Sequence, residues 1–237
     1  MNDPKYELTN NALTYKNQTL YRIRALRGFG DVKKGDMGGY IAHEDNLTHK
    51  DTCWVYEDAK VYGDAKVFGS AKVYGNVKVY DNAIVSDCVE VFDNAKVYGN
   101  AWIGGNAKIC DNAEVYGDSL VRNSAWVYGN AEVFDNAEVY GNAVVYDNAE
   151  IYGKAKVYGD CLVFDNTKVY DYARVYDKAE IDGNAEVYGN AKVYGNAMVY
   201  GNAKVYGYAE VYGKANIYKN AKVFGDNELG GTEVIYE

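Results

Sequence analysis

An aliphatic residue recurs at every sixth position of this chain, and this repeat constrains the fold more than any other feature. From Val55 to Val223, steps of six always reach Val or Ile. The residue two places earlier is Ala in most repeats and is small or β-branched in the others. Self-similarity at a fixed period is the signature of a repeat architecture. The chain must therefore build copies of one short unit that stack on one another.

Each six-residue repeat reads as one short strand and one corner. Lys or Glu usually separates the small residue from the aliphatic one, and Tyr usually follows, so inward and outward positions alternate as in a strand. Gly or Asp comes next, often followed by Asn, and these residues tolerate the left-handed backbone angles of a sharp corner. Proline occurs once, at Pro4, outside the repeats, where it interrupts no ladder of hydrogen bonds.

Strands this short need neighbours, and a parallel β-helix supplies them from the coils above and below. Unbroken six-residue spacing suits a three-sided prism with eighteen residues per coil. We therefore predict an all-β protein whose residues 51–225 form about ten coils around a core of Val and Ala. The first, second and third faces are defined by Val55, Val61 and Val67, each continued in steps of eighteen.

The two ends depart from this regular pattern. Residues 1–50 are predicted to form an N-terminal β cap, with a hairpin around Asn10 and Asn11 and a strand in "TLYRIRALR". Ile41 and Leu47 lie six apart, in phase with Cys53, so coil-like structure is expected from about Ile41. Residues 226–237 are expected to leave the register and to form a short C-terminal cap. Such caps prevent end-to-end pairing of sheets.

The segment "RIRALRGFGDVKKGDMGGYIAHEDNLTHKDTCWVY", followed by hexads of the type "NAKVYGNA", resembles the YdcK-like hexapeptide-repeat family of bacteria and their phages. The resemblance covers nearly the whole chain. It implies a left-handed sense for the β-helix and suggests a phage- or prophage-encoded protein. Members of the family are often described as transferases because of their fold, but a fold alone does not confer a function.

Charge and composition limit the possible partners. The formal net charge of −9 argues against nucleic acid and anionic lipid as partners. The first residues contain no apolar signal core, and no apolar run is long enough to cross a membrane. The spacing of the cysteines resembles no metal site, which favours free thiols in the cytoplasm. These cysteines are Cys53, Cys88, Cys110 and Cys161.

The sequence provides little for catalysis. The resemblance makes an acyltransferase with an acyl-CoA donor one alternative, because such enzymes usually use a histidine base. The only histidines, His43 and His49, precede the regular hexads, and hydrogen bonding in the cap explains both of them. Asp and Asn at the corners could hold cations, but corner geometry explains them equally well. We therefore predict no catalytic residue, no cofactor and no metal.

The outward positions show where a partner could bind. Just before each aliphatic residue, the second face carries only charge, whereas the other two faces carry bulky apolar residues. On the third face the usual Tyr is replaced nearby by Ser86, Gly104 and Arg122. Contiguous exposed apolar surface usually marks an interface, although drift in a permissive repeat is an alternative. The candidate interface residues are Ile84, Trp102, Leu120, Trp126, Val144, Leu162 and Met198.

Three functions remain open from the sequence. The first is a non-catalytic binding or scaffold protein that forms a homo-oligomer, with a parallel trimer suggested by the resemblance, and that binds a host protein or sequesters a small ligand. The second is the acyltransferase, and the third is a purely structural spacer. The tyrosine ladders are explained by strand packing, or by an aromatic platform for sugars, nucleobases or a protein. Ion pairs between the second faces of antiparallel copies are an alternative mode of assembly.

Overall fold

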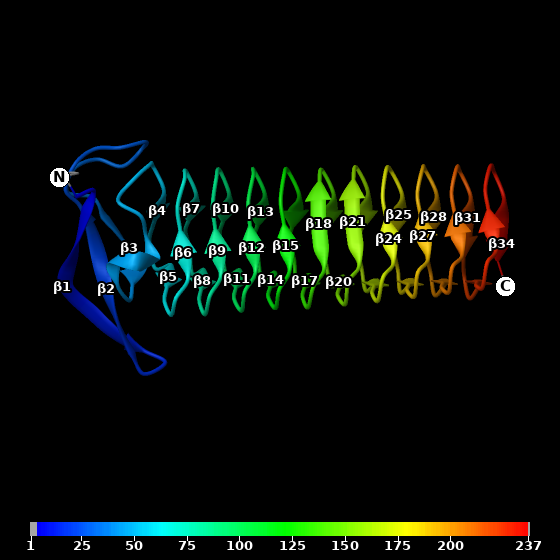
Figure 1. The fold of residues 1–237 in the computed structure, drawn as a ribbon, viewed down its shortest axis with the longest axis horizontal. Helices are drawn as coiled ribbons and strands as arrows, with labels where there is room; N and C mark the ends of the chain where they lie inside the picture. The colour runs from blue at the N-terminus through cyan, green and yellow to red at the C-terminus, as the bar shows by residue number, and fades with distance from the viewer. Residues whose placement is uncertain (1–3, 237) are drawn as a thin grey trace.

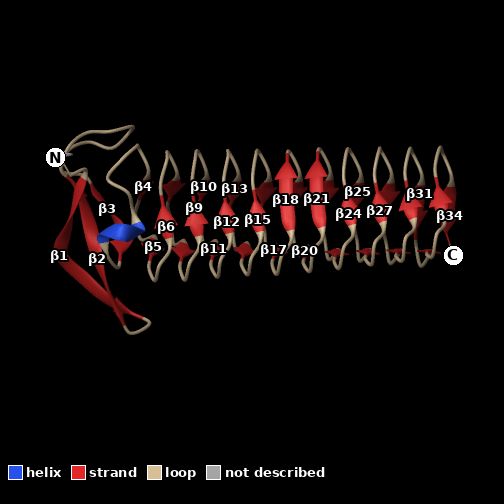
Figure 2. Cartoon of the chain, in the orientation of Figure 1, coloured by secondary structure: helices blue, strands red, loops and turns tan. Residues whose placement is uncertain are grey.

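The computed structural model describes residues 4–236, which form a rod of stacked coils with a hairpin at its N-terminal end (Figure 1). The rod has three faces, and each face is a sheet whose strands come from successive coils (Figure 2). Partners in neighbouring coils lie eighteen residues apart, as Val55 and Val73 show on the first face. This confirms the three-sided parallel β-helix and its register. The left-handed sense stays a prediction from the resemblance.

The first face is a sheet of eleven strands. It consists of β4 (Trp54–Val55), β7 (Lys72–Val73), β10 (Glu90–Val91), β13 (Lys108–Ile109), β16 (Trp126–Val127), β19 (Val144–Val145), β22 (Leu162–Val163), β25 (Glu180–Ile181), β28 (Met198–Val199), β31 (Asn216–Tyr218) and β34 (Val234–Tyr236).

The second face belongs to a sheet of thirteen strands, which also includes the N-terminal hairpin. It consists of β1 (Tyr6–Tyr15), β2 (Gln18–Ala25), β3 (Met37–Ile41), β5 (Lys60–Val61), β8 (Lys78–Val79), β11 (Lys96–Val97), β14 (Glu114–Val115), β17 (Glu132–Val133), β20 (Glu150–Ile151), β23 (Lys168–Val169), β26 (Glu186–Val187), β29 (Lys204–Val205) and β32 (Lys222–Val223).

The third face is a sheet of ten strands. It consists of β6 (Lys66–Val67), β9 (Ile84–Val85), β12 (Trp102–Ile103), β15 (Leu120–Val121), β18 (Glu138–Gly141), β21 (Lys156–Gly159), β24 (Arg174–Val175), β27 (Lys192–Val193), β30 (Glu210–Val211) and β33 (Glu228–Leu229). Within residues 4–236 the sole helical segment is the single 3₁₀ turn η1 (Glu44–Asn46). This part of the chain contains no helix that is long and apolar enough to cross a membrane.

The core is the inside of the prism. The inward aliphatic residues and the small residues two places before them are fully buried, as Ala137 and Val139 illustrate. The corners turn through residues with positive φ, such as Asp147 at 56° and Gly141 at 76°. At Gly141 an added Cβ would lie 2.8 Å from the backbone nitrogen of Gly159, so this corner has no room for a side chain without a shift. Glycine and aspartate at the corners therefore reflect backbone geometry.

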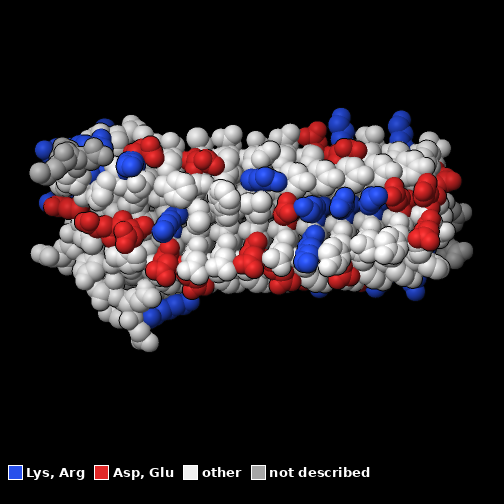
Figure 3. All heavy atoms as spheres, in the orientation of Figure 1, with Lys and Arg blue, Asp and Glu red and all other residues white. Residues whose placement is uncertain are grey.

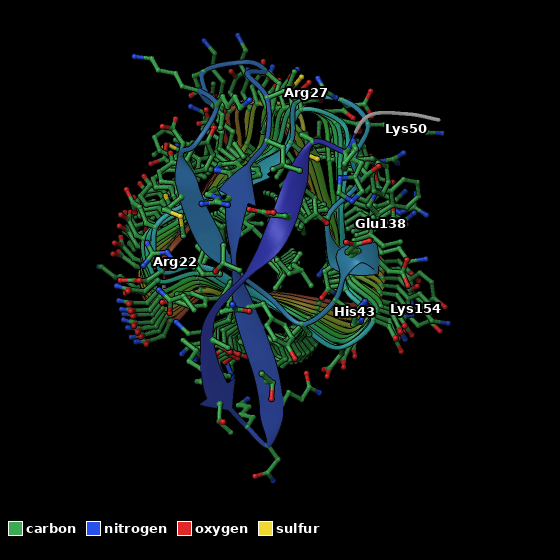
Figure 4. All side chains as sticks on the ribbon, turned by 90° about the vertical axis from the view of Figure 1, so that its left-hand side faces the viewer. Arg22, Arg27, His43, Lys50, Glu138 and Lys154 are labelled. Atoms are coloured by element: carbon green, nitrogen blue, oxygen red, sulfur yellow. The ribbon has the colours of Figure 1, made fainter. Side chains whose placement is uncertain are left out.

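The N-terminal hairpin lies across the open end of the first coil (Figure 4). Tyr6 and Ile23 are buried in the main core, and the Tyr6 hydroxyl donates a 2.7 Å hydrogen bond to the Leu47 carbonyl oxygen. The predicted cap is present, but its turn is not at Asn10 and Asn11. These residues lie inside β1, where the register with β2 shifts, and the chain turns through Lys16 and Asn17, both with positive φ.

The first coil begins where expected but in a different phase. Ile41 pairs with Val61 and Leu47 bridges to Val67, so both occupy aliphatic positions of the coil and not the small position of Cys53. These partners are twenty residues apart instead of eighteen (61 − 41 and 67 − 47). The two extra residues lie between Leu47 and Val55, where the corner is longer than in the regular coils.

The C-terminal segment corrects another prediction. Residues 226–236 keep the register and do not form a separate cap, because Leu229 pairs with Val211 and Ile235 pairs with Ile217. Both are aliphatic residues that continue the six-residue steps beyond Val223. The first face consequently has eleven levels, one more than the approximate ten predicted.

Candidate binding surfaces

Most tyrosines form stacked columns that run along the rod. On the second face an unbroken column runs from Tyr62 to Phe224, with ring centroids 4.7–5.5 Å apart and nearly parallel planes. Several hydroxyls donate to carboxylates of the next coil, such as Tyr98 to Glu114 at 3.0 Å. Each ring covers its neighbour and part of the backbone, which accounts structurally for this column.

The two exposed tryptophans lie where these columns are interrupted. The indole nitrogen of Trp102 donates a 3.2 Å hydrogen bond to the Ser86 hydroxyl, which occupies a tyrosine position of the preceding coil. A Cβ at Gly104 would lie 3.5 Å from that same nitrogen. The indole of Trp102 therefore occupies the space that a tyrosine would take at these positions.

Trp126 covers a second gap of the same kind. Its indole nitrogen lies 3.3 Å from the Cys110 sulfur, which replaces a tyrosine on the first face. Cys110 occupies an outward position of the repeat, but it is only 4% exposed because Trp126 lies over it. Burial raises the pKa of the Cys110 thiol, which disfavours a reactive thiolate.

The predicted apolar ladders are contiguous in the structure. Trp102 pairs with Ile84 and Leu120 on the third face, and Trp126, Val144 and Leu162 follow one another on the first. Trp102 is 52% exposed and Trp126 is 41% exposed. Met198 is exposed but stands apart, between Glu180 and Asn216. We define the apolar edge as Ile84, Trp102, Leu120, Trp126, Val144 and Leu162.

Three lysines of the second face, Lys96, Lys168 and Lys204, have glutamate partners within the chain. Lys168 lies 3.0 Å from Glu150, and Lys96 lies 2.5 Å from Glu114. A hydrogen bond to Glu150 raises the pKa of Lys168. Because these pairs already neutralise part of the charge of the second face, this face has less to gain from ion pairs with a second copy.

Both histidines lie near η1 and line a hollow of about 960 Å³. His43 points outward on the side of the rod where Glu138 and Lys154 also lie (Figure 4), and its Nε2 lies 2.9 Å from the Gly63 carbonyl oxygen. His49 stacks on Tyr6 with ring centroids 4.2 Å apart, and its Nδ1 accepts a 3.2 Å hydrogen bond from the Lys5 amide. Both rings thus have structural partners, and His49 joins the cap to the first coil.

One group of ligand atoms at a corner was not predicted from the sequence. Carboxylate oxygens of Asp93 and Asp111 and the sulfur of Cys110 lie within 4.8 Å of one another. A thiolate would suit a soft metal such as zinc, but the raised pKa of Cys110 works against this form. The two aspartates also have positive φ, so the corner geometry accounts for them.

A second surface was missed by the sequence analysis and lies over β21, β24 and β27. Figure 3 shows a row of cations there, and parallel pairing places Lys156, Arg174 and Lys192 side by side. A hollow of about 590 Å³ adjoins the row and is also lined by Tyr172, which is 55% exposed, and Tyr208, which is 66% exposed. A search of the corner positions in steps of eighteen would have found the two tyrosines. We define the tyrosine–cation groove as Lys156, Tyr172, Arg174, Asn190, Lys192 and Tyr208.

A comparison with protein families supports the resemblance drawn from the sequence. Residues 191–213 match a family model described as "YdcK Beta solenoid repeat". This segment contains β27 and β30, which belong to the same series of coils as the rest of the third face. The match and the fold are consistent with a YdcK-like repeat protein. No curated protein matches the chain.

Proposed function

We propose that this chain is a non-catalytic binding scaffold that self-associates through the apolar edge. The observation that carries the proposal is the exposure of Trp102 and Trp126 on two adjacent faces, each within its own ladder of apolar neighbours. Tryptophan is enriched among residues that dominate binding energy, and burying apolar area contributes roughly 25 cal/mol per Å².

A parallel trimer is the assembly that we propose. A parallel arrangement keeps ladder against ladder along the rod, which allows an interface of the size found in stable complexes. The internal pairing of Lys96 with Glu114 and of Lys168 with Glu150 favours the apolar edge over the charged second face. The resemblance further supports a phage- or prophage-encoded protein that acts in the cytoplasm on a host protein or a small ligand.

The double substitution Trp126→Glu with Leu162→Glu tests the assembly. Both side chains lie outside the core, so charge enters the contact while the coils stay intact. We expect trimers of the wild type and folded monomers of the variant in light scattering, with the β signal retained in circular dichroism. Phe224→Glu, an exposed aromatic position at the far end of the second face, is the matched control and should leave the trimer intact.

Two results would overturn this assembly. An unchanged mass of the double variant, together with dissociation of the wild type in high salt, would move the interface to the second face. A wild type that stays monomeric at high concentration would remove self-association and leave the apolar edge for a different protein partner.

We expect no acyl transfer, because His43 and His49 are engaged in structural contacts. The protein would be incubated with acetyl-CoA and a panel of hydroxyl and amine acceptors, and release of free CoA would be measured. Turnover that is lost in His43→Gln, or in His49→Phe, which keeps a ring on Tyr6, would establish the acyltransferase and contradict the non-catalytic function.

A further inference from the structure

The tyrosine–cation groove contains a column of corner residues with one ring missing. Tyr172, Asn190 and Tyr208 occupy equivalent corners of three successive coils, and the amide of each bonds to the next coil at 2.7–2.8 Å. In the unbroken columns one coil separates ring centroids by 4.7–5.5 Å. Tyr172 and Tyr208 are two coils apart. At the usual strand spacing their levels on the rod are separated by roughly 9.6 Å. Asn190 places a short side chain at the level where a third ring would stack.

The vacant level borders the hollow that Tyr172, Asn190 and Tyr208 line together. Lys154, from the coil before, lies over the Tyr172 ring at 5.2 Å from its centroid, so one face of this ring is covered. Because Lys154 belongs to the coil before, the uncovered face lies on the side of the coil that carries Asn190, and Tyr208 belongs to the coil after that one. A planar ring at that level would lie one coil spacing, roughly 4.8 Å, from the level of each tyrosine, which is within the range for aromatic pairs.

Positive charge stands beside this level. Lys156 lies 2.7 Å from Glu138 and Lys192 lies 2.6 Å from Glu210, so the outer members of the row are paired. Arg174, between them, has no ion-pair partner in the described part of the chain, and its side chain is exposed. An anion bound here would meet a planar guanidinium that is unpaired among the described residues and has several hydrogen-bond donors.

We propose that the tyrosine–cation groove binds a small planar aromatic ring that carries a negatively charged group. The ring takes the vacant level between Tyr172 and Tyr208, and the negative group contacts Arg174, the cation of the row that the described structure leaves unpaired. This site deepens the proposed binding function by naming a ligand class, and it shares no residue with the apolar edge.

The surroundings favour a small ligand over a long polyanion. Glu138 precedes the three cations of the third face, and Glu210 and Glu228 follow them, so the positive row is bounded by acids at both ends. The chain as a whole carries a net charge of −9. A nucleic acid that extended beyond the row would meet like charge on either side.

Titration calorimetry with matched probes tests the ligand class. Adenosine 5′-monophosphate and indole-3-acetate each combine a ring with an anion, as phosphate or as carboxylate. Adenosine lacks the anion, and ribose 5-phosphate lacks the ring. We expect at least one charged aromatic probe to bind about tenfold more tightly than both partial probes, with an affinity that falls as salt rises. Comparison of the two charged probes assigns the anion as phosphate or carboxylate.

Two substitutions test the binding of the ring and the binding of the anion separately. Asn190→Tyr fills the vacant level with a stacked ring, so we expect binding to be lost while the melting temperature is kept or raised. Arg174→Ala should weaken the charged probe about tenfold and leave adenosine unchanged. Asn196→Tyr, which adds an exposed tyrosine at the corner between the third and first faces, is the matched control and should bind like the wild type.

Equal binding of charged and uncharged probes, no binding of either charged probe, or full binding by Asn190→Tyr would overturn this site. None of these outcomes depends on whether the protein forms a trimer. Conversely, loss of the trimer in Trp126→Glu with Leu162→Glu should leave the affinity for the probe as it is. Failure of the groove and failure of the proposed self-association are therefore distinguishable.

Discussion

Above pH 10 the folded protein is expected to lose stability steeply. Burial is the main cause that raises the pKa of the stacked tyrosines, to about 12 for Tyr80 and Tyr194, and a hydrogen bond donated to Glu114 adds to the effect at Tyr98. In the unfolded chain the same hydroxyls ionise near pH 10. A group with a raised folded-state pKa contributes stability that is complete below its unfolded pKa and is lost as pH rises toward the folded value. The loss therefore begins near pH 10 and deepens through pH 12.

Two other kinds of buried group modify this profile. Burial raises the pKa of the Cys161 thiol to about 12, so its contribution begins to be lost from about pH 9. Burial lowers the pKa of Lys5 from 10.5, so protonation of Lys5 is less costly in the unfolded state and its contribution improves as pH rises toward 10.5. The tyrosines greatly outnumber these groups, with 26 in the chain, so the net direction is loss of stability.

The alkaline transition can be measured with two signals. Urea midpoints from circular dichroism should stay level from pH 7 to pH 9 and fall steeply from pH 10 to pH 11. Phenolate absorbance at 295 nm should appear together with unfolding. The triple substitution of Tyr98, Tyr116 and Tyr170 by Phe should make the fall shallower, because Phe keeps the stack and cannot ionise, as Phe134 already demonstrates in the column. Tyrosine ionisation near pH 10 without unfolding would contradict this account.

The second large effect is expected at the inside of the corners. Ala137 is fully buried, and its equivalents in the adjacent coils, Ser119 and Ala155, are also small and buried. Ala137→Leu forces bulk into this narrow column, where the backbones are tied together by hydrogen bonds, for example from the Leu120 amide to the Ala137 carbonyl at 2.9 Å. We expect the free energy of unfolding to fall by about 1–3 kcal/mol.

Tyr140→Ser is the matched comparison in the same repeat. Tyr140 faces outward at the end of its column, stacks on Tyr158 at 4.8 Å and lies under the Arg122 guanidinium. Its replacement loses one stacking contact and one exposed cation–π contact but opens no cavity in the core, so we expect a smaller loss than for Ala137→Leu, about 1 kcal/mol. Thermal and urea melts of both variants would rank them. A larger loss for Tyr140→Ser would mean that the outer columns, and not the inner corners, hold the coils together.

The sequence by itself determined the architecture, because the six-residue repeat continues without an insertion or deletion from Val55 to Val223. Six-residue steps place Val55, Val61 and Val67 on three faces, and eighteen-residue steps then pair every coil with the next. The same arithmetic predicted that Trp126 would stand beside Val144. A strand of two residues has no stability of its own, so a slip at one coil would have to be repeated in all of them.

Only the tertiary structure decided the features that depend on contacts outside the repeat. The hairpin turns at Lys16 and Asn17 because β1 pairs with β2 over a greater length than the Asn10 and Asn11 signal suggested. Trp126 conceals Cys110 because an indole reaches across the space of an absent tyrosine in the preceding coil. The identity of each residue was visible in the sequence, but the direction of a long side chain is set by the neighbours that it finds, and these belong to other coils.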